Sequence, residues 1–351
     1  MKKEVVAVIG LGYVGLPLAL LVDSKGYDVI GIDYDVRKVD SVNSGKSTFV
    51  DQEISTQLQA RKLNAQNNYA GIEKAQVVIV CVPTPVDSEY MPDLGPVSSA
   101  CTEISKNLVR GQLVIIESTI NPGVCEEVIL PILEKHSGLV CGRDFFLAHC
   151  PERINPGDEK WNVSNINRVV GGYDKKSLDL AVQFYESIIE ASIKPMGSLK
   201  EAEAVKIVEN SFRDINIAFV NELAMSFTKL GIDVVNVIDG AATKPFAFMA
   251  HYPGAGVGGH CIPVDPYYLI EYAKQNGFNH KFLAVAREIN NAMPQFVIDQ
   301  LKESFLDTGK KIEDSKVTVL GLSYKANVGD VRESPAIEII KLLRKKSYTQ
   351  T

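Results

Sequence analysis

The stretch that decides the fold runs from residue 5 to residue 33 and reads VVAVIGLGYVGLPLALLVDSKGYDVIGID. A short apolar run precedes Gly10, Gly12 and Gly15, a helical apolar pattern follows them, and a second apolar run ends at Asp33. This order predicts a buried strand, a glycine turn, a helix and a second strand. The glycines allow the backbone to approach a pyrophosphate at the helix N-terminus, and the acid accepts hydrogen bonds from ribose hydroxyls. The stretch predicts a Rossmann-type dinucleotide site.

The acid at the end of the second strand also selects the cofactor. A carboxylate at Asp33 disfavours a 2′-phosphate, so NAD is expected rather than NADP. Tyr13 and Val14 lie inside the glycine motif and are counted with the cofactor-binding residues. Arg37 is a candidate cation near the adenosine, and a surface charge on a helix explains it equally well.

Beyond this stretch, apolar runs and helical stretches alternate as far as residue 197, which predicts a doubly wound α/β domain with a parallel sheet and helices on both faces. The predicted strands cover residues 5–9, 29–32, 77–82, 113–117, 146–149 and 169–171. The predicted helices lie near residues 14–25, 97–108, 126–135 and 176–189.

Polar residues follow three of the later strands, at the edge where a doubly wound sheet binds its ligand. The loops contain VPTP with Thr84, EST with Ser118 and Thr119, and PER with Glu152 and Arg153. Turn capping accounts for Thr84 and Ser118 as well as ligand binding does. Glu152 is a poor capping residue there and is a candidate general base.

Residues 198–230 contain neither Gly nor Pro and predict one long helix, which Ser198 and Glu201 start as a capping box. Lys206, Asn210 and Arg213 are spaced i, i+4 and i+7 and so share a face. That stripe could stabilise an oxyanion or bind phosphate, or it could be a solvated face. Apolar residues on more than one face predict a homodimer through this helix.

The rest of the chain contains a glycine-rich loop, HYPGAGVGGHCIPVDP at residues 251–266, which includes Tyr252, Gly258, Cys261 and Asp265. Cys261 is either a nucleophile or a small buried residue. Helices are expected near 267–276 and 281–306. A strand from Val317 and a helix capped by Ser334 would then begin a second α/β domain. The expected domains are 1–197, 198–306 and a partial, truncated one at 315–351.

Composition narrows the class of protein. With 351 residues, a net charge of −6 and 23% charged residues, the chain is expected to be globular, and it is not expected to bind nucleic acid. Six cysteines without a C-x-x-C pair predict no metal site and a reducing, cytoplasmic setting. Glycines and Pro17 interrupt the apolar run at residues 5–22, so no membrane role is expected.

The motifs together resemble the UDP-glucose/GDP-mannose dehydrogenase family of nucleotide-sugar 6-dehydrogenases. The landmarks are GLGYVGLPLA, VPTP, EST, PER, EAEAVKIVENSFRDINIAFVNE, GAGVGGHCIPVDP and GLSYKANVGDVRESPA, in the family's order. The resemblance implies oxidation of a sugar C6 alcohol to the uronic acid with two NAD⁺, as in polysaccharide biosynthesis. It is strongest for the branch that acts on UDP-N-acetylhexosamines, with UDP-N-acetylmannosamine as first choice and UDP-N-acetylglucosamine as second.

The resemblance also implies residue roles. Cys261 would hold the sugar as a thiohemiacetal and then a thioester, Lys206 and Asn210 would stabilise the oxyanion, Glu152 and Asp265 would position or activate water, and Thr119 would lie by the nicotinamide. Lys325 and Arg332 would reach toward the nucleotide. The remaining residues expected to bind substrate are Arg153, Arg213, Tyr252 and Gly258.

Three alternatives stay open from the sequence. They are a UDP-glucose 6-dehydrogenase, a β-hydroxyacid dehydrogenase that shares the layout and needs no Cys261, and a truncated NAD-binding protein without activity. Family members continue for several tens of residues beyond the point where this sequence ends in KKSYTQT.

Overall fold

The computed structural model describes residues 4–49, 51–87, 91–154, 160–259, 261–312, 315–325 and 329–345. The chain divides into two compact units, Met1–Ile207 and Val208–Thr351. His260 in the glycine-rich loop and the last residues of the expected third domain, 346–351, lie outside the described residues.

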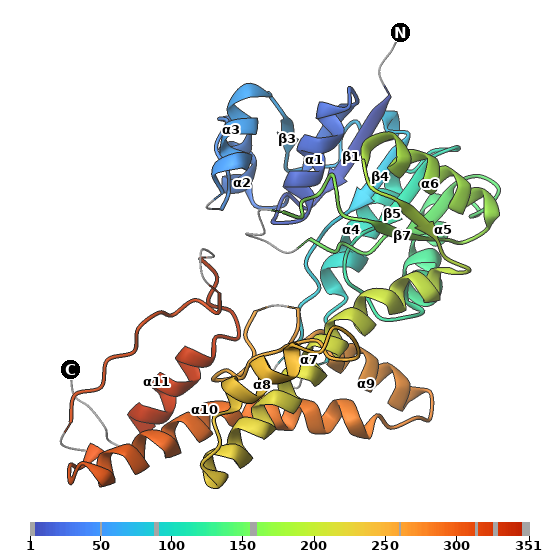
Figure 1. The fold of residues 1–351 in the computed structure, drawn as a ribbon. Helices are drawn as coiled ribbons and strands as arrows, with labels where there is room; N and C mark the ends of the chain where they lie inside the picture. The colour runs from blue at the N-terminus through green and yellow to red at the C-terminus, as the bar shows by residue number, and fades with distance from the viewer. Residues whose placement is uncertain are drawn as a thin grey trace. The chain divides into compact units, whose positions relative to one another are not determined.

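The first unit is built on an eight-stranded sheet in the order β3-β2-β1-β4-β5-β6-β7-β8 (Figure 1). The strands are β1 (Val5–Ile9), β2 (Asp28–Ile32), β3 (Asn64–Gln66), β4 (Val77–Val80), β5 (Leu113–Ile116), β6 (Phe146–His149), β7 (Arg168–Gly172) and β8 (Ile193–Pro195). The order reverses next to β1, as a doubly wound sheet requires. The predicted Rossmann-type fold is confirmed.

Helices cover both faces of this sheet. They are α1 (Gly15–Ser24), α2 (Val36–Asn43), α3 (Gln52–Ala60), the 3₁₀ turn η1 (Ile72–Lys74), α4 (Gly95–Asn107), the π-helical turn η2 (Cys125–Ile129), α5 (Leu130–Ser137) and α6 (Lys175–Ile188). Apolar residues of α1, α3 and α6 form one buried cluster with the strands, and those of α4 and α5 form the other. The central strands are buried on both sides, which explains their continuous apolar sequences.

One strand runs against the predicted direction. β7 pairs with β6 in antiparallel fashion, Ala148 opposite Gly172 and His149 opposite Gly171, whereas a parallel sheet was expected. A parallel neighbour needs a long crossover, usually a helix, and the described residues between these two strands contain none. The chain therefore turns back directly, and α6 then restores parallel pairing between β7 and β8.

Short elements escaped the sequence analysis because they lack a strong apolar pattern. β3 is the three-residue strand Asn-Ala-Gln, and β8 is also three residues long. The helix predicted near 126–135 is instead a π-helical turn that continues into α5.

The long helix forms as predicted. α7 runs from Leu199 to Leu230, and the Ser198 hydroxyl accepts the backbone N–H of Glu201 at 3.2 Å. The Glu201 carboxylate accepts the N–H of Gly197. Near the start of α7, buried Glu203 accepts the N–H groups of Gly123 and Cys125, and so ties the helix to the loop after β5.

The second unit contains helices in the described residues and no strand. After α7 come α8 (Val234–Ala242), α9 (Asp265–Gln275), α10 (Lys281–Asp307) and α11 (Pro335–Lys345). The strand predicted from Val317 is wrong, because no neighbouring strand of the described unit is there to complete a ladder. Val317 and Val319 instead pack against buried Ile298, Ile312 and Leu343.

The helix predicted after Ser334 does begin at Pro335. The Ser334 hydroxyl donates to the carbonyl of Leu322 and so anchors the preceding loop. Among the described residues, no helix is long and apolar enough to cross a membrane.

Candidate functional site

The glycine motif forms a cradle at the carboxyl ends of β1 and β4. A Cβ on Gly10, which has φ of 93°, would lie 2.6 Å from the Cys81 carbonyl oxygen, and one on Gly15 would lie 1.9 Å from the Gly10 oxygen. No atom lies within 4 Å of a Cβ built on Gly12, so this position faces open space. Val14 precedes α1, whose first turn has no side-chain cap. Uncapped N–H groups beside an open glycine suit a pyrophosphate.

Asp33 directly follows β2, at the end of the predicted strand, and is buried. Its carboxylate accepts the N–H groups of Leu11 at 2.9 Å and Asp35 at 3.0 Å, and Lys38 Nζ lies 3.3 Å away. These contacts use three of the roughly four acceptor positions of a carboxylate, which leaves room for a ribose hydroxyl. The described residues fit NAD.

Lys38 contacts Asp33, whereas Arg37, the cation expected near the adenosine, contacts another carboxylate. Arg37 turns to Asp35, with Nη2 2.9 Å from the carboxylate, and its side chain is 91% exposed. This hydrogen bond raises the pKa of Arg37. Sequence spacing gave no reason to prefer Lys38, one residue further along α2. Tyr13 stacks on Phe49, with ring centroids 4.2 Å apart.

Two predicted hydroxyls link neighbouring loops. Thr84 Oγ1 donates to the Thr119 carbonyl at 2.6 Å, and Ser118 Oγ donates to the Val82 carbonyl at 2.7 Å. Both contacts hold the loop after β4 against the loop after β5. These contacts differ from turn capping, because each joins two loops that are 35 or 36 residues apart in the sequence.

The loop after β6 is fixed by its own carboxylate. Glu152 Oε1 accepts the N–H groups of Arg153 and Ile154, both at 2.6 Å. Arg153 Nη1 donates to the Asn167 carbonyl at 2.9 Å. Glu152 Oε2 lies 2.7 Å from Nη1 of Arg168, a buried cation that the sequence analysis missed inside an apolar strand.

The stripe on α7 is not uniform in exposure. Lys206 is half-buried, Asn210 is buried and Arg213 is exposed. Asn210 Nδ2 donates to Asp265 Oδ2 at 2.5 Å, and Asp265 is the buried first residue of α9. In the second unit, two residues with predicted roles in the chemistry are thus in direct contact.

Cys261 is exposed and lies in a turn just before α9. Its carbonyl accepts the N–H groups of Val264 and Asp265. The Arg332 carbonyl accepts the N–H of Gly259. The pKa of Arg332 is raised first by its hydrogen bond to Asp330, and the nearby Cys261 adds to the effect. A cation beside a cysteine favours the thiolate.

The glycines before Cys261 have a packing reason. A Cβ on Gly258 would lie 2.6 Å from Tyr324 Cβ and 2.9 Å from the Glu333 oxygen. The segment that carries Lys325 thus packs closely against Gly258. Tyr252, another predicted substrate residue, donates to Asp239 at 2.8 Å.

Buried polar side chains connect the start of this loop to α7 and α10. Gly254 donates its N–H to Asn221 Oδ1, and Asn221 donates to Asn290 at 2.8 Å. Asn290 and Arg287 both donate to Asp214 Oδ1. Burial raises the pKa of Asp214, and the Arg287 guanidinium opposes that rise. The network therefore holds the first residues of the loop in place.

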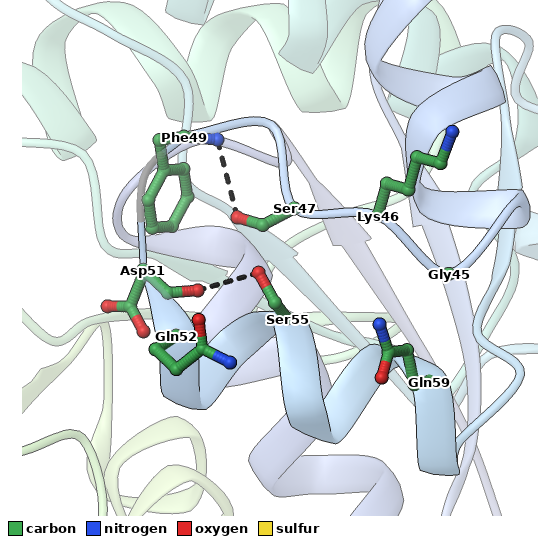
Figure 2. A pocket seen from close by; sticks show the side chains of 8 residues that line it. All are labelled: Gly45, Lys46, Ser47, Phe49, Asp51, Gln52, Ser55 and Gln59. Carbon is green, nitrogen blue, oxygen red and sulfur yellow. Dashed lines mark hydrogen bonds between the residues drawn. The ribbon is translucent and has the colours of Figure 1, made fainter.

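Two hollows lie on the first unit. Figure 2 shows one of about 320 Å³ between α3 and the loop that joins it to α2, where Phe49 donates its N–H to Ser47 and Ser55 donates to the Asp51 carbonyl. None of the predicted site residues lines it. Tyr13 lines the other, of about 350 Å³. Among the described residues, no group of His, Cys, Asp or Glu could hold a metal ion.

The strand order, the glycine cradle and Asp33 define a Rossmann-type unit suited to NAD. Residues 4–189 match the NAD binding domain of the UDP-glucose/GDP-mannose dehydrogenase family, residues 200–292 its central domain and residues 318–350 its UDP binding domain. The chain belongs to this family, and the resemblance noted in the sequence is confirmed.

Relatives are similar over nearly the whole chain. A UDP-N-acetyl-D-glucosamine 6-dehydrogenase of Pseudomonas aeruginosa is 40% identical over 98% of this chain and 81% of its own length. A UDP-N-acetyl-D-mannosamine dehydrogenase of Pyrococcus horikoshii is 38% identical over 97% and 80%. The solved structure of UDP-D-ManNAc dehydrogenase from Pyrococcus horikoshii has a TM-score of 0.92, with 38% identity over 97% of this chain and 81% of that one.

A more distant structure bears on the β-hydroxyacid dehydrogenase alternative. The 3-hydroxyisobutyrate dehydrogenase of Mycobacterium tuberculosis has a TM-score of 0.61 at 18% identity, over 85% of this chain and 95% of that one. This likeness extends to the fold alone.

Proposed function

We propose that the chain oxidises the C6 alcohol of a UDP-N-acetylhexosamine to the carboxylate, with UDP-N-acetylmannosamine as first substrate and UDP-N-acetylglucosamine as second. The names of the relatives at 38% and 40% identity support both epimers. The observation that carries the proposal is the Asn210–Asp265 hydrogen bond at the base of the Cys261 loop, because it joins groups suited to oxyanion and water chemistry.

The reaction takes four electrons in two steps. NAD⁺ would accept the hydride in each step. After the first hydride and a proton leave, C6 is an aldehyde; the Cys261 thiolate adds to it, and the oxygen takes a proton to give a thiohemiacetal. Loss of a second hydride and a proton gives a thioester. Water cleaves the C–S bond, and the products are the carboxylate and the free thiol.

Each proposed residue has a task in these steps. Lys206 and Asn210 would stabilise the oxygen at C6 while it is negatively charged. Glu152 and Asp265 would position or activate the water, and Thr119 would lie by the nicotinamide. Tethering by Cys261 keeps the reactive aldehyde from escaping between the two oxidations.

The remaining assignments concern substrate and cofactor contacts. The residues proposed to bind the UDP-sugar are Glu152, Arg153, Lys206, Asn210, Arg213, Tyr252, Gly258 and Lys325. Those proposed for NAD are Gly10, Gly12, Tyr13, Val14, Gly15, Asp33, Arg37, Thr84, Ser118, Thr119, Lys325 and Arg332. Titrating NAD and UDP separately into single variants tests these sets, since each variant should weaken one ligand and spare the other, except a Lys325 variant, which should weaken both.

We further propose a cytoplasmic homodimer that pairs through α7. Val208, Phe212 and Phe219 on this helix have exposed side chains, and contiguous exposed apolar residues on a helix favour a partner surface. The six cysteines form no disulfide bond in the described residues, which accords with a reducing compartment.

A further inference from the structure

Four polar side chains meet inside the first unit, beneath the carboxyl-terminal edge of the sheet. They are Glu117 after β5, Glu152 after β6, Arg168 at the start of β7 and Tyr185 in α6, and none is more than 5% exposed. Arg168 Nη1 lies 2.7 Å from Glu152 Oε2 and 3.4 Å from Glu117 Oε2. Tyr185 donates its hydroxyl to Glu117 Oε1 at 2.5 Å. The guanidinium of Arg168 thus lies within ion-pair distance of two carboxyl groups.

The antiparallel pairing of β7 explains how Arg168 reaches this place. If the register of His149 with Gly171 is continued by three residues, Arg168 comes opposite Glu152. In a parallel strand the first residue would lie at the other edge of the sheet. The reversal of β7 therefore brings a cation to the edge that carries the predicted site.

An ion pair that only stabilises the fold is expected to have all its buried polar atoms hydrogen-bonded, and this cluster does not. Nε and Nη2 of Arg168 are buried and make no hydrogen bond to the described residues. Glu152 Oε2 lies 2.7 Å from Nη1 in an ion pair but makes no aligned hydrogen bond to it. Buried polar atoms without hydrogen bonds destabilise a fold, so a functional role is a better explanation for them.

The charge of the cluster is also unbalanced. Two ionised carboxylates against one guanidinium would leave a buried negative charge, which is costly. Burial raises the pKa of Glu117 to about 7; Arg168 opposes this rise, and the charge of Glu152 adds to it. The other titratable groups that face the cluster are the thiols of Cys81 and Cys150, whose pKa values burial raises. Near neutral pH, Glu117 therefore changes the charge around Glu152.

We propose that Arg168, Glu117 and Tyr185 are positioning residues for Glu152: they hold its carboxylate in one orientation and set the local charge against which it accepts a proton. The loop holds Oε1 through two N–H groups, and Arg168 holds Oε2 through the ion pair. The inference rests on the proposed function, because it gives Glu152 the water-directed role stated there.

The first experiment is a double-mutant cycle on turnover with UDP-N-acetylmannosamine and NAD⁺. Arg168→Lys should lower kcat about tenfold or more and change KM less than threefold, because general-base catalysis depends on orientation. Glu152→Gln with Arg168→Lys should lose no more than Glu152→Gln alone, since residues that act as a unit are not additive. If the kcat of the double variant is instead lowered by the product of the two single-variant factors, the proposal is overturned. Arg143→Lys, which affects the ion pair of the exposed Arg143 with Asp144 before β6, is the matched control.

A second pair of variants keeps the test decisive if Arg168→Lys does not fold. Glu117→Gln preserves shape and removes the titrating charge, and Tyr185→Phe removes only its hydrogen bond. In the cycle with Glu152→Gln, Glu117→Gln should again cause no further loss. Alone, it should leave kcat unchanged well below pH 7, where Glu117 is protonated, and it should remove the change in kcat that ionisation of Glu117 causes near pH 7. An unmoved profile with additive losses would contradict the proposal.

A third readout does not depend on turnover. The infrared band of the Glu117 carboxylic acid, identified from its absence in Glu117→Gln, should disappear with a midpoint near pH 7 in the wild-type chain. In Glu152→Gln the midpoint should fall, because a neighbouring negative charge is gone. An unchanged midpoint would overturn the coupling even if no NADH forms, whereas absent NADH with a shifted midpoint would count against the proposed function alone.

Discussion

Cys261 is the residue on which the proposed double oxidation depends. We expect Cys261→Ser to keep NAD affinity within about twofold and to form no uronic acid, because an alkoxide leaving group and a weaker nucleophile replace the thiolate. Fluorescence titration of NAD and chromatography of the sugar products measure the two outcomes. Cys125→Ser, at a buried position in the first unit, is a control for loss of a thiol. Normal NADH yield from Cys261→Ser would contradict the covalent mechanism.

Glu117 should make stability depend on pH in a defined window. Its pKa is raised from 4.5 to about 7 by burial, so the folded chain binds more protons than the unfolded chain between these values. Stability therefore falls as pH rises through the window. Glu117→Gln removes this loss, so its free energy of unfolding relative to wild type should rise from pH 4.5 to 7.

Urea unfolding across this pH range provides the measurement. Burial lowers the pKa of His149 to about 3, which acts in the opposite direction below pH 6.5, so the difference between variant and wild type is the quantity to compare. Asp144→Asn is the control, since the pKa of Asp144, lowered to about 2 mainly by Arg143, lies outside the window. A Glu117→Gln difference that is constant with pH would refute the assigned titration.

At the scale of elements, two glycines of the same turn should have different roles, one in folding and one in NAD binding. Gly15→Ala should destabilise the first unit by several kcal/mol, because its Cβ would overlap the Gly10 carbonyl oxygen. Gly12→Ala meets no atom within 4 Å and should fold normally, but it should weaken NAD binding about tenfold or more, since the methyl group occupies the space expected for the pyrophosphate.

Thermal unfolding and NAD titration of the same two variants compare these effects. Equal destabilisation by both, with no change in NAD affinity for Gly12→Ala, would mean that the cradle does not bind the cofactor.

The sequence predicted the elements that have strong local signals and missed those fixed by distant contacts. The glycine motif, the buried strands and α7 follow from composition and periodicity. The direction of β7 does not, because an apolar run is the same in a parallel or an antiparallel pair. Arg168 was missed for this reason. The contact of Lys38 with Asp33 was missed because sequence spacing cannot rank adjacent helix positions. Val317 was assigned to a strand from its apolar pattern, although a strand also needs a neighbour.

At the scale of the whole molecule, the exposed apolar residues of α7 predict self-association. Phe212→Glu places a charge on the proposed interface and should shift the chain from dimer to monomer, because burying an unpaired charge between protomers is costly. Light scattering coupled to size-exclusion chromatography gives the mass. Glu186→Lys, on α6, is a charge-changing control. A wild-type monomer, or an unchanged dimer in Phe212→Glu, would contradict pairing through this part of α7.

The central claim is a four-electron oxidation of a UDP-N-acetylhexosamine, and counting NADH per sugar tests it most directly. UDP-N-acetylmannosamine, UDP-N-acetylglucosamine, UDP-glucose and GDP-mannose are supplied separately with excess NAD⁺, and the absorbance of NADH is compared with sugar consumed. The account predicts two NADH per molecule of an N-acetylhexosamine substrate. One NADH per sugar, turnover of UDP-glucose alone, or no NADH from any of the four would contradict it.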